Sequence, residues 1–297
     1  MILQPLFTRG SEPAPAAIFL SGAGSNARNL LSLARQFPPR DWKPVLLVTD
    51  NPERSNARAI AAEFDIPLLE SDIRQFYRER GENSISLATE KGRTLRALWT
   101  EDLLKKIAPQ QIRLGLLAGF IPLCNLSDAF PCLNVHPGDL TLTDDQGARV
   151  LAGLHYRPVE DVLCNPELNH FRSSVIQICP FTGNGAKEMD GGPLLGLSKP
   201  VPADRGSWTA EDLQRIRNTR IKGKTPCDPL RELAEKNVEA LKQQGDHQVF
   251  FPAVNAFAAG KYAVNGDQLF YRTGETSEFL PVRSVEFDLD SERPLWL

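Results

Sequence analysis

Short apolar runs alternate with helix-like patterns along the first half of the chain. Buried strands are predicted at 16–20, 44–48, 66–69 and 114–120. Between them, apolar residues recur at helical spacing around 30–34, 55–64 and 93–107. Because parallel strands need crossover helices, this alternation predicts an α/β fold with a doubly wound, mostly parallel, Rossmann-like sheet.

The second half of the chain continues with two more predicted strands, at 173–179 and 194–197. Amphipathic patterns then predict a helix over 230–241 and another that begins at Phe250 and ends at Gly260. Asn265-Gly266, between two short apolar runs, predicts a β-hairpin with a type I′ turn. We therefore expect a catalytic domain at 1–205, and C-terminal helices and a hairpin at 206–297 packed on the same domain.

Composition narrows the class of protein. The chain has 297 residues, 41% hydrophobic and 24% charged, as in a soluble globular protein. A net charge of −3 gives no argument for binding nucleic acid or an anionic membrane. No apolar stretch reaches the roughly 18 residues that span a bilayer, and the N-terminal segment lacks the apolar core of a secretory signal. We expect a cytoplasmic protein.

Cysteine usage agrees with that expectation. The five cysteines are irregularly spaced and form no C-x-x-C pair, which argues against a zinc ribbon or a redox dithiol. We expect reduced, mostly buried thiols and no bound metal. A local basic run at 211–224 is most simply a solvated helix face or loop.

The strand that ends in Leu133-Asn134-Val135-His136-Pro137 carries candidate chemistry. Successive strand side chains alternate faces, so Asn134 and His136 point the same way, roughly 6.6 Å apart. Pro137 lacks an N–H and tends to end a strand, which places both groups at its C-terminal tip, where open α/β sheets bind ligands. The plain alternative is that Asn134 caps a turn and His136 is a satisfied core histidine.

A glycine loop, Ser21-Gly22-Ala23-Gly24-Ser25-Asn26, lies between the first strand and the first helix. In this arrangement free backbone N–H groups and the helix dipole can hold an anion, usually phosphate. Glycines allow the sharp turn and the close approach of the backbone. A simple strand-to-helix turn is the alternative.

A third motif is Glu188-Met189-Asp190-Gly191-Gly192-Pro193, and a tight turn alone would explain its aspartate. In order and spacing, the three motifs resemble the folate-dependent formyltransferases, and most of all the glycinamide ribonucleotide (GAR) transformylases. The similarity extends from about Ile18 to Val201. A weaker likeness is the Phe250-Phe251-Pro252 helix and the hairpin after it. The resemblance implies the Rossmann-like formyltransferase fold with a small helical and hairpin C-terminal extension.

The resemblance also implies a reaction, in which a substrate amine attacks the formyl carbon of the co-substrate 10-formyltetrahydrofolate. Asn134 and a protonated His136 would stabilise the oxyanion of the tetrahedral intermediate, and Asp190 would pair with His136 and order a water that relays protons. The acceptor would be a small phosphorylated amine, with GAR, of purine biosynthesis, as the first choice. The phosphate-binding residues would be Gly22, Ala23, Gly24, Ser25 and Asn26. The folate-binding residues would be Arg93, Ile121, Pro122 and Leu123.

Two departures from the family pattern affect the acceptor side. His136-Pro137 is followed by Gly138-Asp139 and about eight extra residues, so the segment 138–152 is longer and more polar than usual. The late acidic residue that helps bind the ribonucleotide corresponds to Asp246, but the spacing to Pro252 is one residue longer.

Other functions stay open. Gly22, Gly24 and Ala27 satisfy G-x-G-x-x-A, and Asp50 ends the second strand, as in NAD-binding dehydrogenases. Within formyl transfer, an amino sugar nucleotide could be the acceptor, or formyl-folate could be hydrolysed. The residues after 205 are too few and too acidic for the C-terminal domain of the methionyl-tRNA formyltransferases. A non-catalytic binding module is a third class, and a homodimer is left open.

Overall fold

The computed structural model describes residues 2–153, 156–180, 190–221 and 223–297. The strands of the first half are β1 (Gln4–Pro5), β2 (Ala14–Leu20), β3 (Trp42–Thr49), β4 (Leu68–Glu70), β5 (Leu114–Leu117), β6 (Cys132–His136) and β7 (His170–Phe171). Those of the second half are β8 (Ser174–Gln177), β9 (Leu194–Leu197), β10 (Val201–Pro202), β11 (Tyr262–Asn265), β12 (Gln268–Tyr271), β13 (Leu280–Asp288) and β14 (Ser291–Trp296). The α-helices are α1 (Ser25–Gln36), α2 (Ala57–Phe64), α3 (Ile73–Arg78), α4 (Glu90–Ile107), α5 (Arg157–Leu163), α7 (Ala210–Asn218), α8 (Pro229–Leu241) and α9 (His247–Ala258). Short 3-10 helices η1 (Ala108–Gln110) and η2 (Leu126–Asp128) and a π-helix η3 (Lys242–Asp246) complete them.

A single large sheet runs through the described residues in the order β1-β11-β12-β13-β9-β8-β6-β5-β2-β3-β4, with β14 paired to β13. Neighbouring strands from β4 to β6 are parallel, whereas β8 runs antiparallel to both β6 and β9. The chain passes from β2 to β3 and β4 on one side and then crosses to β5 and β6 on the other. The topological switch point, where such sheets bind ligands, therefore lies between the C-terminal ends of β2 and β5.

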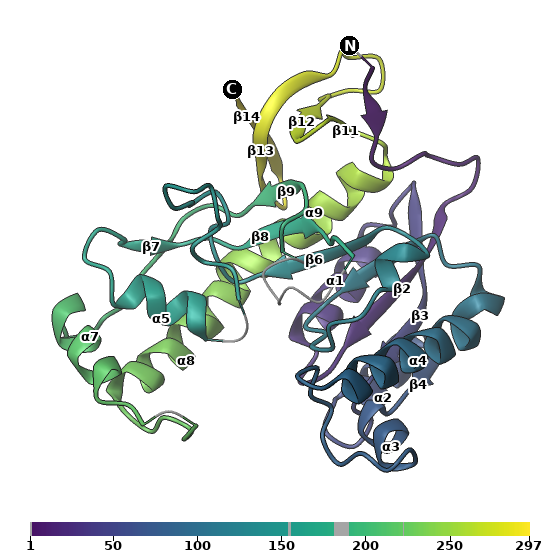
Figure 1. Cartoon of the computed structure of the whole chain (residues 1–297). Helices are drawn as coiled ribbons and strands as arrows, with labels where there is room; N and C mark the ends of the chain where they lie inside the picture. Colours follow the sequence, from purple (N-terminus) through teal and green to yellow (C-terminus); the bar gives the residue numbers. More distant parts are fainter. Residues whose placement is uncertain (1, 154–155, 181–189, 222) are drawn as a thin grey trace.

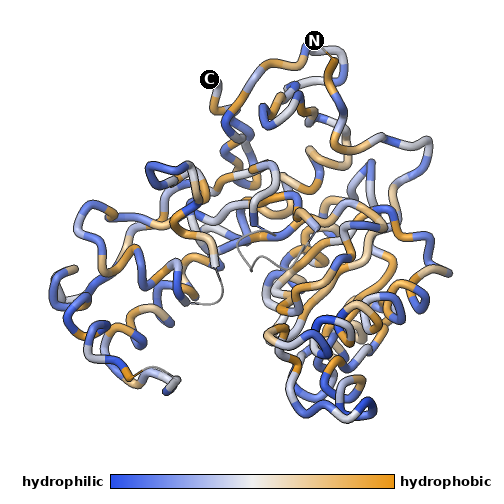
Figure 2. The backbone as a smooth tube through the Cα atoms, in the orientation of Figure 1, coloured by the Kyte–Doolittle hydropathy of each residue, from blue (hydrophilic) through white to orange (hydrophobic). Residues whose placement is uncertain are grey.

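Helices cover both faces of the parallel part, which confirms the doubly wound α/β fold (Figure 1). One core cluster joins α1, α2 and α9 to the sheet, and another joins α3 and α4 to the opposite face. Because both faces are covered, β2 is a continuous apolar run with fully buried Ile18 and Phe19 on opposite faces. Figure 2 shows the hydrophobic residues concentrated along the central strands.

The C-terminal segments belong to the same sheet. The predicted hairpin is present as β11 and β12, but Asn265 pairs with Gln268, so the two-residue turn is Gly266-Asp267 and not Asn265-Gly266. Gly266 has φ +58°, and Asp267 is not among the residues with positive φ, so the type I′ turn is not formed. Strand β13 then pairs parallel with β9, which ties the C-terminal strands to the central sheet.

The helix predicted to begin at Phe250 begins earlier. α8 continues through the π-helix η3 into α9, which starts at His247 and contains Pro252 in its interior. A π-turn holds one more residue than an α-turn, and such turns are frequent at functional sites. η3 ends at Asp246, so it lies immediately before the stretch from Asp246 to Pro252 in which the sequence has one residue more than the family pattern.

Helices α5, α7 and α8 form a lobe with its own apolar cluster, on the left in Figure 1. The basic run at 211–224 belongs to this lobe. Arg220 contacts Glu160 at 2.7 Å and Asp228 at 2.8 Å, and Arg217 contacts Asp161 at 2.7 Å. These two arginines are therefore partly buried in ion pairs within the lobe and do not form the solvated face that the sequence predicted. Lys222 lies outside the described residues.

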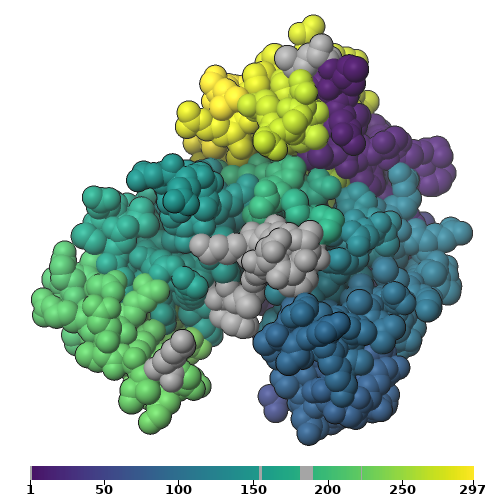
Figure 3. Space-filling view, in the orientation of Figure 1, coloured from purple at the N-terminus to yellow at the C-terminus, as the bar shows by residue number. Residues whose placement is uncertain are grey.

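The space-filling view shows the surface hollowed between this lobe and the part of the molecule built from α3 and α4 (Figure 3). Among the described residues, no helix is both long enough and apolar enough to cross a membrane.

Candidate active site

The tip of β6 brings two polar side chains to the C-terminal end of the sheet. The strand ends at His136, immediately before Pro137, as predicted. His136 is buried, and its Nε2–H donates to the Leu151 carbonyl over 2.8 Å. This bond fixes the tautomer of the neutral ring, because a carbonyl can only accept. Asn134 is half-buried on the same face of the strand, and its side chain has no hydrogen bond to the part of the chain that the structure describes.

Asp190 lies beside the other ring nitrogen of His136. Its Oδ2 is 3.9 Å from His136 Nδ1, and the two side chains are only 13% and 4% exposed. This separation exceeds a hydrogen bond but allows one bridging water. Burial raises the pKa of the Asp190 carboxyl, and His136, the Gly153 N–H and Arg149 oppose that rise. The structure thus brings together the three residues Asn134, His136 and Asp190, although nearly 60 positions separate them in the sequence. Lys187, Glu188 and Met189 lie outside the described residues.

The long segment 138–152 packs directly on this group. Besides the Leu151 carbonyl on His136, Arg149 donates from Nη1 to the Asp190 carbonyl and from Nη2 to the Gly192 carbonyl, the latter at 2.8 Å. The segment is fixed at its base, because Ser174 Oγ donates to the Gly138 carbonyl and accepts from the Leu140 N–H. The sequence placed this segment beside the site but did not single out Arg149 or Leu151.

The glycine loop at 22–26 leaves backbone donors open at the start of α1. Gly24 has φ +69°, a left-handed conformation, and a Cβ there would come within 2.6 Å of Leu20. The first N–H groups of α1 have no intrahelical partner, and no side chain among the described residues caps them. Asn56 steadies the loop from outside by donating to the Gly22 and Ala23 carbonyls. The loop therefore offers open backbone donors to an anion, and phosphate binding there stays a prediction.

Asp246 connects this loop to the rest of the sheet. Its Oδ2 accepts from Asn26 Nδ2 at 2.8 Å, and its Oδ1 accepts from Ser173 Oγ at 2.5 Å. Asp246 is only 4% exposed, and burial raises the pKa of its carboxyl. Asp246, the last residue of the π-helix η3, thus lies against the glycine loop. No sequence signal indicated that Ser173 would be its second partner.

Replacing Asp246 with alanine should lower the free energy of unfolding by about 1–3 kcal/mol, because the buried Ser173 hydroxyl and Asn26 amide lose their acceptor. Replacing it with asparagine should cost clearly less. Asn26 Oδ1 is buried without a partner among the described residues and, after rotation of its amide, can accept from the new side chain. Urea unfolding of both variants measures the difference. Equal losses would contradict this account.

The predicted folate residues line two adjoining cavities. Arg93 and Leu123 line one of about 350 Å³, whereas Ile121, Pro122 and Leu123 line one of about 300 Å³. Buried Arg96 borders both and donates to the Leu123 and Ile85 carbonyls at 2.7 and 2.8 Å. Arg96 was missed by the sequence analysis, although it lies one helical turn after Arg93.

Asp50, the candidate ribose-binding acid, also borders the smaller cavity. It is 3% exposed, and its Oδ1 accepts from Ser21 Oγ at 2.5 Å. Ser21 Oγ also accepts from the Ile121 N–H. Asp50 is therefore linked through Ser21 to Ile121, next to the switch point between β2 and β5. Because Asp50 is almost fully buried, little of its carboxylate is open to a dinucleotide ribose, which weakens the dehydrogenase interpretation.

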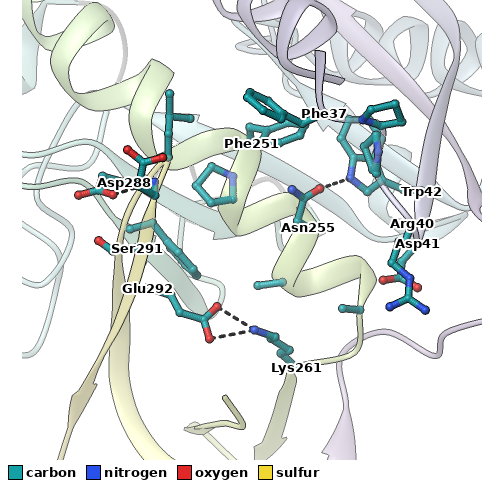
Figure 4. A pocket seen from close by; sticks show the side chains of 18 of the residues that line it. Phe37, Arg40, Asp41, Trp42, Phe251, Asn255, Lys261, Asp288, Ser291 and Glu292 are labelled. Atoms are coloured by element: carbon teal, nitrogen blue, oxygen red, sulfur yellow. Dashed lines mark hydrogen bonds and ion pairs between the residues drawn. The ribbon is translucent and has the colours of Figure 1, made fainter. Parts of the chain in front are cut away.

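A further cavity of about 690 Å³ lies at the other end of the sheet, beside the start of β3 (Figure 4). Trp42 donates to Asn255 at 2.7 Å, and Lys261 pairs with Glu292 at 2.7 Å. These two pairs of lining residues thus bond to each other, and the cavity is separate from the tip of β6.

Residues of the types that bind metal ions do not cluster in the described part of the chain. The described part of the chain has no group of three or more His, Cys, Asp or Glu side chains that could hold a metal ion. Cys124, Cys132 and Cys164 are buried, Cys179 is half-buried and Cys227 is exposed.

Comparisons with known proteins identify the fold. No protein-family model and no curated protein sequence matches the chain. Among solved structures, it is similar to glycinamide ribonucleotide transformylase 1 from Symbiobacterium toebii, with 18% identity, a TM-score of 0.56, and coverage of 88% of this chain and 94% of that one. Phosphoribosylglycinamide formyltransferase from Coxiella burnetii has 18% identity and a TM-score of 0.56, with coverage of 93% and 100%. Formyltetrahydrofolate deformylase from Burkholderia mallei has 14% identity and a TM-score of 0.50, with coverage of 88% and 70%. The chain therefore has the Rossmann-like formyltransferase fold that its motifs predicted.

Proposed function

We propose that this protein transfers the formyl group of 10-formyltetrahydrofolate to the amine of a small, phosphorylated acceptor. The observation that carries the proposal is the position of Asp190, 3.9 Å from Nδ1 of His136 and beside the tip of β6, with Asn134 two residues before His136 on the same face. A satisfied core histidine would not need a half-buried carboxylate at that nitrogen. The shared fold with GAR transformylases supports the same reaction class.

Each of the residues Asn134, His136 and Asp190 has a separate role in the proposed reaction. The acceptor nitrogen forms a bond to the formyl carbon, which gives a tetrahedral intermediate with an oxyanion and an ammonium. Asn134, whose amide is uncommitted among the described residues, donates to the oxyanion. The ammonium proton passes to the folate N10 through His136 Nδ1 and a water held by Asp190, and the bond from carbon to N10 then breaks. Nδ1 is the nitrogen that serves, because Nε2 is bonded to Leu151.

The acceptor phosphate would bind the open N–H groups of the glycine loop at 22–26, at the positive end of α1. Arg93, Ile121, Pro122 and Leu123 would contact the folate through the two adjoining cavities. GAR remains the first choice of acceptor. We further propose a cytoplasmic protein that acts on small molecules and binds neither nucleic acid nor membrane.

Hydrolysis of formyl-folate is a second candidate, and one observation favours it. Both carboxylate oxygens of Asp246 already accept hydrogen bonds from the protein, so Asp246 is not available to bind the ribose of a ribonucleotide acceptor. The similarity to a formyltetrahydrofolate deformylase fits that outcome. In this case water would replace the amine as the nucleophile.

A spectrophotometric assay of tetrahydrofolate release from a formyl-folate analogue tests the proposal. The panel contains GAR, an amino sugar nucleotide and a reaction without amine. Release that depends on GAR supports the first choice, and release with the amino sugar nucleotide alone excludes it. Release without any amine indicates hydrolysis. If no tetrahydrofolate is released under any condition, and NADH but not folinic acid quenches the protein fluorescence, the result would contradict formyl transfer and indicate dinucleotide binding.

A further inference from the structure

Arg149 holds the turn that carries Asp190. Its guanidinium donates to the carbonyls of Asp190 and Gly192, which lie two residues apart in the D-G-G-P turn. Arginine suits this contact because its planar group presents parallel N–H donors, which a lysine ammonium cannot reproduce. Nearby, Gly192 packs so closely on the Gln177 carbonyl that a Cβ would come within 1.9 Å of it, so the turn has little room to shift.

The segment that carries Arg149 is itself ordered by internal bonds. Thr143 and Arg149 form a β-bridge, and the Val150 N–H donates to the Leu142 carbonyl at 3.0 Å. At the tip, Asp144 accepts from the N–H groups of Gln146 and Ala148. Two residues beyond Arg149, the Leu151 carbonyl fixes the His136 ring. One segment therefore contacts both the histidine and the turn of the aspartate.

We propose that Arg149 is a positioning residue, which sets the Asp190 carboxylate against His136 by clamping the D-G-G-P turn to the 138–152 segment. This inference rests on the proposed function, in which Asp190 and His136 relay a proton. It also assigns a role to the long 138–152 segment, since this segment supplies the arginine. Arg149 acts through Asp190 and does not itself have to touch the substrate.

Electrostatics predict how the loss of Arg149 changes Asp190. Among the described residues, the groups that act on the Asp190 carboxyl are His136, the Gly153 N–H and Arg149, all of which lower a pKa that burial raises. Arg149 also faces Cys179, and Asp246 faces His136 from η3. Removing the Arg149 charge takes away one lowering influence. The Asp190 pKa should then rise, so the ionised carboxylate is lost at a higher pH than in the wild type.

The test compares R149M, R149K and the control Q146A, an exposed residue at the tip of the same segment. R149M should lower kcat by roughly 10- to 100-fold, because the proton relay is misplaced. It should also move the acid limb of the kcat profile to higher pH. R149K keeps the positive charge but lacks the two parallel N–H donors of the guanidinium. Its acid limb should therefore stay close to that of the wild type, whereas its kcat should recover only in part. Q146A should match the wild type.

The proposal is overturned if R149M has wild-type kcat and an unshifted acid limb. It is also overturned if R149M loses kcat without any shift of the acid limb, because that result would indicate a merely structural role. Deuterium exchange of the peptide at 190–197 supplies a readout without activity. Exchange should be faster in R149M than in Q146A and the wild type, and equal exchange also overturns the proposal. If the wild type shows neither transfer nor hydrolysis, the proposed function fails, and the exchange experiment alone decides whether Arg149 holds the turn.

Discussion

Replacing His136 with glutamine will lower kcat for formyl transfer by roughly 100- to 10,000-fold, the range typical for loss of a general acid–base group. Glutamine can still donate an amide N–H to the Leu151 carbonyl, which now accepts from His136 Nε2 at 2.8 Å. It cannot gain and lose a proton at the position of Nδ1. The melting temperature and the KM for the folate should therefore change little, whereas kcat falls. Steady-state kinetics and thermal unfolding measure the two effects.

The matched control is His170→Gln. His170 is half-buried on β7, and its Nδ1 contacts the neighbouring Asn169 at 2.9 Å, away from the tip of β6. This variant should keep wild-type kinetics. If His136→Gln also retains wild-type kcat, His136 is a satisfied core histidine and the proposed proton transfer has no carrier.

Local patterns in the sequence were sufficient to predict the parallel half of the fold. The predicted strand at 16–20 is the C-terminal part of β2, and β6 ends immediately before Pro137 as expected. Both predictions rest on local features, namely a continuous apolar run and the missing N–H of a proline. The same alternation placed Asn134 and His136 on one face. The pairing of β13 with β9 had no such signal, since it joins segments almost 90 residues apart.

Errors of one or a few residues arose where tertiary contacts decide the local conformation. The hairpin turn moved from Asn265-Gly266 to Gly266-Asp267 because the strand register pairs Asn265 with Gln268. The last long helix starts at His247 and includes Pro252, although proline usually marks a first turn. Here the chain enters α9 from the preceding π-helix, so no new start is required.

The polar contacts of the site were the hardest part to predict. Asn26, Ser173 and Asp246 meet from three distant segments, and a single sequence does not show which polar groups will pair after folding. Arg149 was likewise invisible as a contact of the D-G-G-P turn, because its loop has no regular pattern. The type and order of the motifs therefore predicted the candidate chemistry, whereas the residues that position it came from the structure.

Replacing Asn134 with leucine should lower kcat by roughly 100- to 1000-fold, because the oxyanion loses a donor that acts only as charge develops. The half-buried position between Leu117 and Ile176 accepts an apolar side chain of similar size, so folding should be preserved. Since the interaction forms in the transition state, kcat and kcat/KM should fall together and the KM for the folate should stay nearly constant. Initial rates at varied folate concentration measure this. A raised KM with an unchanged kcat would instead make Asn134 a binding residue for the ground state, and the oxyanion would then need another donor.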